Sequence, residues 1–164
     1  MQTHVLICFI CAAGARLRNC AIFSIFVRLY CNATTNCKIY MKKVIATPDA
    51  PKAVGPYSQA IEVNGILYIS GQIPVNPADG KVQEDIVAAA HQSLKNIGAI
   101  LKEAGMTYDN VVKTTVLLAD IADFKAVNEV YAEYFTGDKP ARACYQAAAL
   151  PLGVKVEIEA IAVK

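Results

Sequence analysis

The sequence predicts an α+β fold in which one mixed sheet of about six strands carries two helices on one face. Strand-like and helix-like segments alternate after residue 41, and two of the segments have apolar residues at spacings of three and four. An Asn-Gly pair joins two apolar runs, which is typical of a tight hairpin. The order of elements is β-ββ-α-β-α-ββ, and this order favours a sheet with its helices gathered on one side.

The first strands are short and precede the first helix. Val44-Ile45 begins one strand, and a Pro-rich turn leads from it to residues 59–63. Asn64-Gly65 then separates that run from residues 66–70, and both runs are apolar. We therefore expect a β-hairpin at this point, because such a pair suits the positive φ angles of a two-residue turn.

Two segments have the periodicity of amphipathic helices. Residues 83–104 form the first, with an apolar stripe made of Ile86, Ala90, Leu94, Ile97 and Leu101. Gly105 follows as the expected C-terminal stop. Asp120 or Asp123 is the expected N-cap of the second helix, whose stripe consists of Phe124, Val127, Tyr131 and Tyr134.

The remaining segments predict three longer strands. Residues 111–118 are rich in β-branched side chains, so we expect a central strand that is buried on both faces. Residues 141–147 and 154–163 are expected to close the sheet. If both helices cover one face, the second face of the sheet must meet water or a partner.

The charge and cysteine content divide the chain at residue 40. All 14 acidic residues lie after it with 12 of the 16 basic ones, so residues 41–164 carry a net charge of −2. Five of the six cysteines lie before it. We expect residues 1–40 to be upstream sequence translated from a wrong start, with a mitochondrial presequence as the alternative. Residues 41–164 are expected to form one domain.

The residue inventory excludes several kinds of chemistry. His91 is the one histidine after residue 40, and its position outside the apolar stripe predicts a surface side chain. A single surface histidine is a poor base for a Ser-His-Asp triad, and it is too few ligands for a metal site that needs several His side chains. We therefore expect no metal. The phosphate-binding motifs of nucleotide folds are absent from the sequence. Catalysis would have to use Arg, Glu, Cys, Tyr, Ser and backbone groups.

The last two strands each carry a polar stripe, because side chains alternate along a strand. One stripe consists of Arg142, Cys144 and Gln146, and the other of Lys155, Glu157 and Glu159. Lys155 and Glu159 suit a solvated surface. Arg142 suits the binding of a small carboxylate, which a guanidinium can grip with two hydrogen bonds. Glu157 is a candidate for handling protons or orienting a water molecule.

At these residues the chain resembles the RidA/YjgF family of reactive-intermediate deaminases over residues 42–164. The resemblance rests on five separated motifs, which are GPYSQA at 55–60, SGQIP at 70–74, VN at 127–128, PARAC at 140–144 and KVEIEA at 155–160. It implies a chorismate-mutase-like subunit in a homotrimer, with a barrel-like core and an active site in each intersubunit cleft. It also implies hydrolysis of short 2-imino acids, formed from 2-aminoacrylate or 2-aminocrotonate, to 2-oxo acids and ammonia without a cofactor.

The resemblance assigns roles to individual residues. Arg142 matches the arginine that binds the substrate carboxylate, and Glu157 matches the glutamate that positions the attacking water. The remaining pocket positions match Tyr57, Ser70, Gly71, Asn128 and Cys144. Each of these also has a purely structural explanation, such as packing of Tyr57 in its turn or burial of Cys144 as a small apolar side chain.

Two other functions use the same residues differently. One is an RNA-cleaving translation inhibitor, a label attached to some relatives, although a net charge of −2 on residues 41–164 suits a phosphate backbone poorly. The other is a ligand-binding or chaperone-like trimer without turnover. We expect no nucleic-acid or membrane partner and a cytoplasmic location, or a mitochondrial one if residues 1–40 are a presequence.

Overall fold

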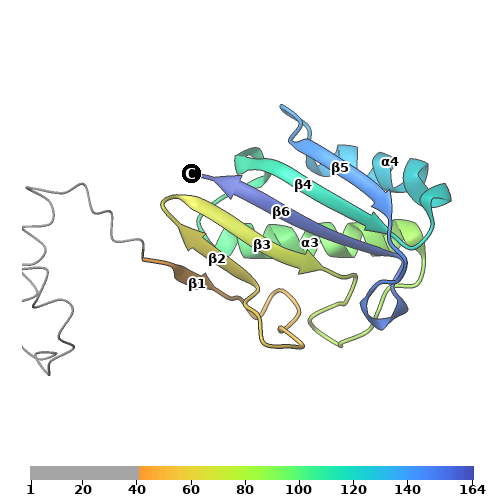
Figure 1. The fold of residues 1–164 in the computed structure, drawn as a ribbon, viewed down its shortest axis with the longest axis horizontal. Coiled ribbons are helices and arrows are strands. Elements are labelled where there is room, and N and C mark those ends of the chain that lie inside the picture. The colour runs from red at the N-terminus through yellow and green to blue at the C-terminus, as the bar shows by residue number, and fades with distance from the viewer. Residues whose placement is uncertain (1–40) are drawn as a thin grey trace, which may run out of the picture. The chain divides into compact units, whose positions relative to one another are not determined.

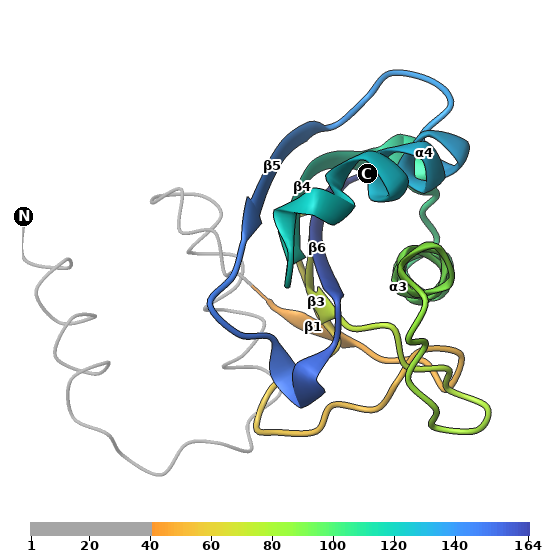
Figure 2. The same ribbon diagram turned by 90° about the vertical axis from the view of Figure 1, so that its right-hand side faces the viewer.

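The computed structural model describes residues 41–164, in which one six-stranded sheet carries two long helices (Figure 1). The strands are β1 (Lys43–Ile45), β2 (Ala60–Val63), β3 (Ile66–Gln72), β4 (Val111–Leu118), β5 (Ala141–Gln146) and β6 (Val156–Val163). The long helices are α3 (Ile86–Glu103) and α4 (Phe124–Tyr134). Short 3-10 helices are η1 (Tyr108–Asn110), η2 (Ile121–Asp123) and η3 (Pro151–Gly153). Both long helices lie on the same side of the sheet, as predicted (Figure 2).

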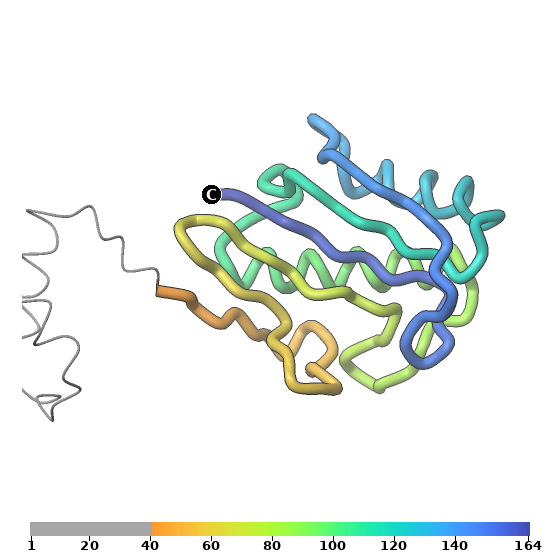
Figure 3. Tube along the Cα trace, in the orientation of Figure 1, coloured from red at the N-terminus to blue at the C-terminus, as the bar shows by residue number. Residues whose placement is uncertain are grey.

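The strands are ordered β1-β2-β3-β6-β4-β5 across the sheet. β4 and β5 pair in parallel, and all other neighbours are antiparallel, so the sheet is mixed as predicted. The C-terminal strand β6 is inserted between β3 and β4 (Figure 3). The polar residues of β6 are therefore separated from those of β5 by the whole width of β4.

The hairpin between β2 and β3 confirms the prediction from the Asn-Gly pair. Asn64 and Gly65 have φ angles of 53° and 78°, which are left-handed conformations that this residue pair adopts easily. The antiparallel register pairs Val63 with Ile66 directly across the turn.

Helix α3 confirms the predicted apolar stripe. Ala90, Leu94, Ile97 and Leu101 are fully buried against the sheet. The helix begins at Ile86 rather than at Gln83, because the Asp85 carboxylate caps it by accepting a hydrogen bond from the Ala88 N–H at 3.0 Å. The predicted stop is confirmed by Gly105, whose φ angle of 70° suits a helix C-terminus.

Helix α4 differs in part from its prediction. Asp120 caps η2 by accepting from the Ala122 N–H, whereas Asp123 makes no side-chain cap. The buried residues of the helix are Val127, Val130 and Tyr131. Phe124 was predicted in the apolar stripe but is 40% exposed, because its ring lies at the first turn beside the Arg142 guanidinium instead of in the core.

The prediction that residues 111–118 are buried on both faces is wrong for the described chain. Thr114, Val116 and Leu118 are fully buried beneath the helices, but the alternate residues face the other side of the sheet and are half-buried or exposed. The helices cover one face only, so the reverse face has nothing in the described chain to cover it.

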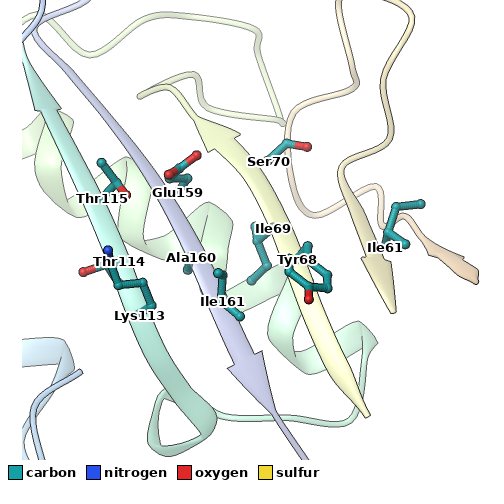
Figure 4. Close-up of a pocket in the computed structure, with 10 residues that line it drawn as sticks. All are labelled: Ile61, Tyr68, Ile69, Ser70, Lys113, Thr114, Thr115, Glu159, Ala160 and Ile161. Atoms are coloured by element: carbon teal, nitrogen blue, oxygen red, sulfur yellow. The ribbon is translucent and has the colours of Figure 1, made fainter. Parts of the chain in front are cut away.

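This open face of the sheet combines apolar and polar side chains. Tyr68 is 46% exposed on it, and a shallow hollow of about 320 Å³ includes Ile61, Lys113, Glu159 and Ile161 in its lining (Figure 4). Large apolar side chains left together on a surface are typical of a contact with another protein.

The predictions for residues 1–40 lie outside the described residues. In the part that the structure describes, no helix has both the length and the apolar character needed to cross a membrane. His91 is not the free surface residue predicted, because it is half-buried and its Nδ1 lies 3.0 Å from the Tyr134 hydroxyl between the two long helices.

Candidate active site

Glu157 lies on the open face of the sheet beside Gly71. In β6, Val156 and Ile158 are fully buried on the helix side, so the intervening Glu157 points to the opposite side. The register between β3 and β6 shifts between Ile69 and Gln72, which places Gly71 in an irregular step of the strand. The Glu157 carboxylate lies so close to the Gly71 backbone that it occupies the space a side chain at residue 71 would need.

Burial of Glu157 changes its acidity. The side chain is half-buried, and this desolvation raises the pKa of its carboxyl group above the ordinary value. The negative charge of Glu159, two residues along the same face, raises the pKa of Glu157 further. A carboxylate with a raised pKa accepts a proton more readily, which suits a group that activates water.

Ser70 and Tyr57 lie near the same end of β3. The Ser70 hydroxyl donates to the Ser58 carbonyl at 2.7 Å, and the Ser70 N–H donates to the Gln59 carbonyl at 3.0 Å. Ser70 therefore ties β3 to the segment that carries Tyr57, and its side chain lies at the open face (Figure 4). Tyr57 and Gly71 line the same pocket of about 240 Å³, and Tyr57 is 48% exposed there.

Two buried amide side chains hold the loops around this pocket, and the sequence did not single out either of them. Gln59 donates to the carbonyls of Thr47, Ala50 and Pro51 and accepts from the Thr47 N–H. Asn96 on α3 donates to the Ile73 and Val75 carbonyls at 3.1 and 3.0 Å. The available signal was a polar amide within an apolar pattern, such as Asn96 beside Ile97 in the first helix.

Arg142 and Cys144 lie on the opposite, helix-covered face. In the parallel register of β4 and β5, Arg142 is the partner of Thr114 and Cys144 is the partner of Val116. Both β4 residues are fully buried beneath the helices, and paired residues of neighbouring strands point to the same face. The structure therefore confirms that Arg142 and Cys144 share a face, and it identifies this face as the one next to α4.

Two aromatic side chains of α4 lie against the guanidinium of Arg142, which is an exposed residue. Its Cζ lies 4.7 Å from the centre of the Tyr131 ring and 5.6 Å from that of Phe124. Asn128 is four residues after Phe124 and three before Tyr131, so it lies on the same side of the helix. The sequence assigned both rings to the apolar core and did not predict their contact with Arg142.

Cys144 has the character of a lining residue. It is half-buried against the apolar core, and this burial raises the pKa of its thiol, while the Arg142 charge opposes the rise. A raised pKa leaves less of the reactive thiolate at neutral pH. The structure therefore favours a small packing side chain here over a nucleophile.

The predicted site residues thus form two groups on opposite faces of one sheet. The first, which we call the glutamate half-site, consists of Tyr57, Ser70, Gly71 and Glu157. The second, the arginine half-site, consists of Asn128, Arg142 and Cys144. The described chain does not bring Arg142 and Glu157 together, because β4 and the thickness of the sheet separate them. Residues 41–164 contain no cluster of three metal-ligating side chains.

Comparisons with known proteins identify a family and similar proteins for this chain. The model of the Endoribonuclease L-PSP family matches residues 47–164. A mouse protein named 2-iminobutanoate/2-iminopropanoate deaminase is 58% identical over 125 residues, which are 76% of this chain and 93% of that protein. The crystal structure of the YjgF gene product from E. coli is 48% identical, with a TM-score of 0.73 over 74% of this chain and 98% of that one. E. coli TdcF with bound serine is 43% identical, with a TM-score of 0.73 and the same coverage.

Proposed function

The chain belongs to the Endoribonuclease L-PSP family, also called YjgF/RidA, and from this membership we propose that it is a 2-iminobutanoate/2-iminopropanoate deaminase. It hydrolyses short 2-imino acids to 2-oxo acids and ammonia. The observation that carries the proposal is the 58% identity, over 93% of its length, to a mouse protein of that name. Arg142 gives the chemical reason, because its guanidinium is stacked on aromatic rings and its N–H groups remain available to an anion.

The reaction needs a bound carboxylate and a positioned water molecule. The water oxygen forms a bond to C2 of the imino acid, and the π electrons of the C=N bond move to the nitrogen. The nitrogen of this tetrahedral species takes up the proton that the water lost, and the C–N bond breaks with its electron pair leaving on nitrogen as ammonia. The hydroxyl group on C2 loses its proton, and C2 becomes a carbonyl carbon. An imine protonated on nitrogen is already electrophilic, so positioning and charge stabilisation account for most of the catalysis.

We assign Arg142 to the substrate carboxylate and Glu157 to the water. Arg142 can grip the carboxylate with two parallel hydrogen bonds. Glu157, whose pKa is raised by burial, accepts the proton that the water loses on attack. We assign the lining of the substrate pocket to five residues, which are Tyr57, Ser70, Gly71, Asn128 and Cys144. The hydroxyl of Ser70 also fixes the end of β3 next to Gly71. The serine bound to TdcF, a small amino acid with a carboxylate, supports a site of this kind.

We propose that the two half-sites meet between subunits of a homotrimer. The arginine half-site of one subunit then faces the glutamate half-site of the next, and three equivalent contacts close a ring. Two features of the described chain support this: the half-sites lie on opposite faces of the sheet, and the open face carries exposed apolar residues such as Tyr68 and Tyr145.

We further propose a cytoplasmic enzyme formed by residues 41–164 without a nucleic-acid or membrane partner. The net charge of −2 on these residues supports the absence of a nucleic-acid role. Residues 1–40 are proposed not to belong to the fold, and a mitochondrial location is the alternative if they act as a presequence. N-terminal sequencing of the native protein tests both points.

A coupled assay tests the activity. A dehydratase that releases 2-aminoacrylate is mixed with the purified protein, and the loss of the imine is followed in time. We expect wild type and Lys95→Ala, which removes an exposed charge on α3, to accelerate the loss equally. Arg142→Ala should remove most of the acceleration. No acceleration by wild type would defeat the proposal, and equal acceleration by Arg142→Ala and wild type would defeat the role assigned to Arg142. Binding of a 2-oxo acid without any turnover would favour a ligand sensor.

A further inference from the structure

The guanidinium of Arg142 is held by an aromatic ring rather than by an acidic side chain. Its Cζ lies 4.7 Å from the centre of the Tyr131 ring. Of the ion pairs formed within residues 41–164, neither includes Arg142. A stacked guanidinium keeps its N–H groups directed outward in the plane of the group, where an incoming carboxylate can accept them.

The Tyr131 ring is itself fixed in place. Tyr131 is 6% exposed, and its hydroxyl lies 2.8 Å from the Thr114 hydroxyl. Thr114 is fully buried on β4, where it is also the register partner of Arg142 on β5. Thr114, Tyr131 and Arg142 therefore form a closed set of contacts that joins β4, α4 and β5.

Phe124 contacts the same guanidinium but is less constrained. Its ring centre is 5.6 Å from Cζ, its side chain is 40% exposed, and it carries no polar atom that could be anchored. Tyr131 is therefore the closer and the better anchored of the two aromatic contacts of the guanidinium.

We propose that Tyr131, anchored by Thr114, is a positioning residue that pre-orients the Arg142 guanidinium for the substrate carboxylate. This inference rests on the proposed function. A free arginine side chain loses considerable rotamer freedom when it binds a ligand, and a guanidinium already held in one plane has lost that freedom before the ligand arrives. Tyr131 touches Arg142 and not the reacting atoms, so its effect is on affinity.

Three variants separate the ring from its anchor. Tyr131→Leu removes the stacking surface, whereas Tyr131→Phe and Thr114→Val remove only the hydroxyl contact. We expect the dissociation constant of 2-oxobutanoate, measured by calorimetry, to rise about tenfold in Tyr131→Leu and about twofold to threefold in the other two. The double variant Tyr131→Phe with Thr114→Val should bind as either single one does, because both remove the same bond.

Steady-state kinetics should show the same loss of affinity, as an increase in KM. A contact made equally in the ground state and the transition state changes KM and leaves kcat alone. We expect KM for the imino acid to rise about tenfold in Tyr131→Leu with kcat within about twofold of wild type.

Tyr108→Phe is the matched control. The Tyr108 hydroxyl donates to the Leu94 carbonyl at 2.7 Å, and its ring contacts Tyr134 and Phe135 rather than Arg142. This variant loses a hydroxyl hydrogen bond of the same kind, so it should lose stability as Tyr131→Phe does while the affinity for 2-oxobutanoate stays unchanged.

Nuclear magnetic resonance gives a readout that does not depend on turnover. The ring current of Tyr131 should shift the Arg142 Hε signal, and Tyr131→Leu should remove most of that shift. Unchanged 2-oxobutanoate affinity and an unchanged Hε signal in Tyr131→Leu would overturn the inference. If instead wild type does not accelerate the loss of the imine, the proposed function fails, and the Hε signal still decides whether Tyr131 positions Arg142.

Discussion

The carboxylate of Glu157 occupies the place of a side chain on Gly71. A Cβ atom at residue 71 would lie 1.8 Å from the Glu157 Oε1 atom and 2.7 Å from its Cδ atom. Real Cβ atoms essentially never come within 3.0 Å of a heavy atom of this kind, so the carboxylate would have to move. Glycine at this step of β3 is therefore a condition for the position of the carboxylate on β6.

We expect Gly71→Ala to displace the Glu157 carboxylate and to lower kcat/KM by about tenfold to a hundredfold, since a misplacement of about 1 Å has effects of that size. Substrate binding through Arg142 should change little. Gly137→Ala is the control, because its Cβ would have only an ordinary contact of 3.7 Å with Asp109. Steady-state kinetics of both variants check this, and equal kcat/KM values in the two would contradict it.

Glu157 is expected to cost stability at neutral pH. Burial raises the pKa of its carboxyl group, so the folded protein binds this proton more tightly than the unfolded chain does. The free energy of unfolding therefore falls as the pH rises from the unfolded pKa through the folded one. We expect Glu157→Gln to unfold at a higher urea concentration than wild type at about pH 7.5, with a smaller difference at about pH 3.5. A difference that is larger at the acid pH would reverse the assigned sign.

Glu159 is expected to tune the pH dependence of activity. Its charge contributes to the raised pKa of Glu157, after desolvation. If Glu157 acts as the ionised base, as we propose, activity should fall at acid pH as the carboxylate takes up a proton. Glu159→Gln should move this acid limb of the kcat/KM profile to lower pH. Glu133→Gln, an exposed change on α4, should leave the limb in place, and an equal shift in both variants would show a general charge effect.

Gln59 is expected to stabilise the loop that carries Tyr57. Its buried amide makes four hydrogen bonds with backbone groups of residues 47–51. Gln59→Leu leaves those groups without partners, so we expect the free energy of unfolding to fall by about 2 to 4 kcal/mol. Denaturation in urea measures the change. Lys52→Ala, an exposed substitution in the same loop, should alter stability by less than about 0.5 kcal/mol, and a similarly small effect of Gln59→Leu would contradict the assigned role.

The elements that the sequence predicts well are those set by local chemistry. The turn at Asn64-Gly65 needs positive φ angles that this pair tolerates, and the α3 stripe follows directly from helical periodicity. Helix boundaries shifted where a cap decided them, as Asp85 did for α3. The prediction that β4 is buried on both faces was wrong. Burial of the second face depends on what packs over the sheet and not on the sequence of the strand itself.

The polar stripes on the last two strands were predictable from the sequence, but their arrangement in space was not. Alternation along a strand correctly grouped Arg142 with Cys144 and placed Glu157 on a polar stripe. Whether two stripes face the same way depends on strand order and register, and these come from contacts distant in sequence, such as Thr114 with both Arg142 and Ala160. The contacts of Arg142 with Phe124 and Tyr131 on α4 were not predicted either, because aromatic residues at helical spacing are normally core residues.

Complementation between two inactive variants should show whether the half-sites meet between subunits. Arg142→Ala retains an intact glutamate half-site, and Glu157→Gln retains an intact arginine half-site. After the two are mixed, unfolded and refolded together in equal amounts, random assembly pairs one intact half with the other at about a quarter of the sites. We expect activity to recover to about a quarter of the wild-type value, although each variant refolded alone stays inactive.

The control for this experiment is Arg142→Ala refolded with the double variant Arg142→Ala and Glu157→Gln. Every arginine half-site in that mixture is damaged, so no combination of subunits can regain activity. Recovery in the first mixture and none in the second requires a site shared between chains, because a site built within one chain would keep its own defect in any assembly. Absence of recovery in a first mixture that contains mixed oligomers would instead require Arg142 and Glu157 to act within one subunit, which their positions on opposite faces of the sheet oppose.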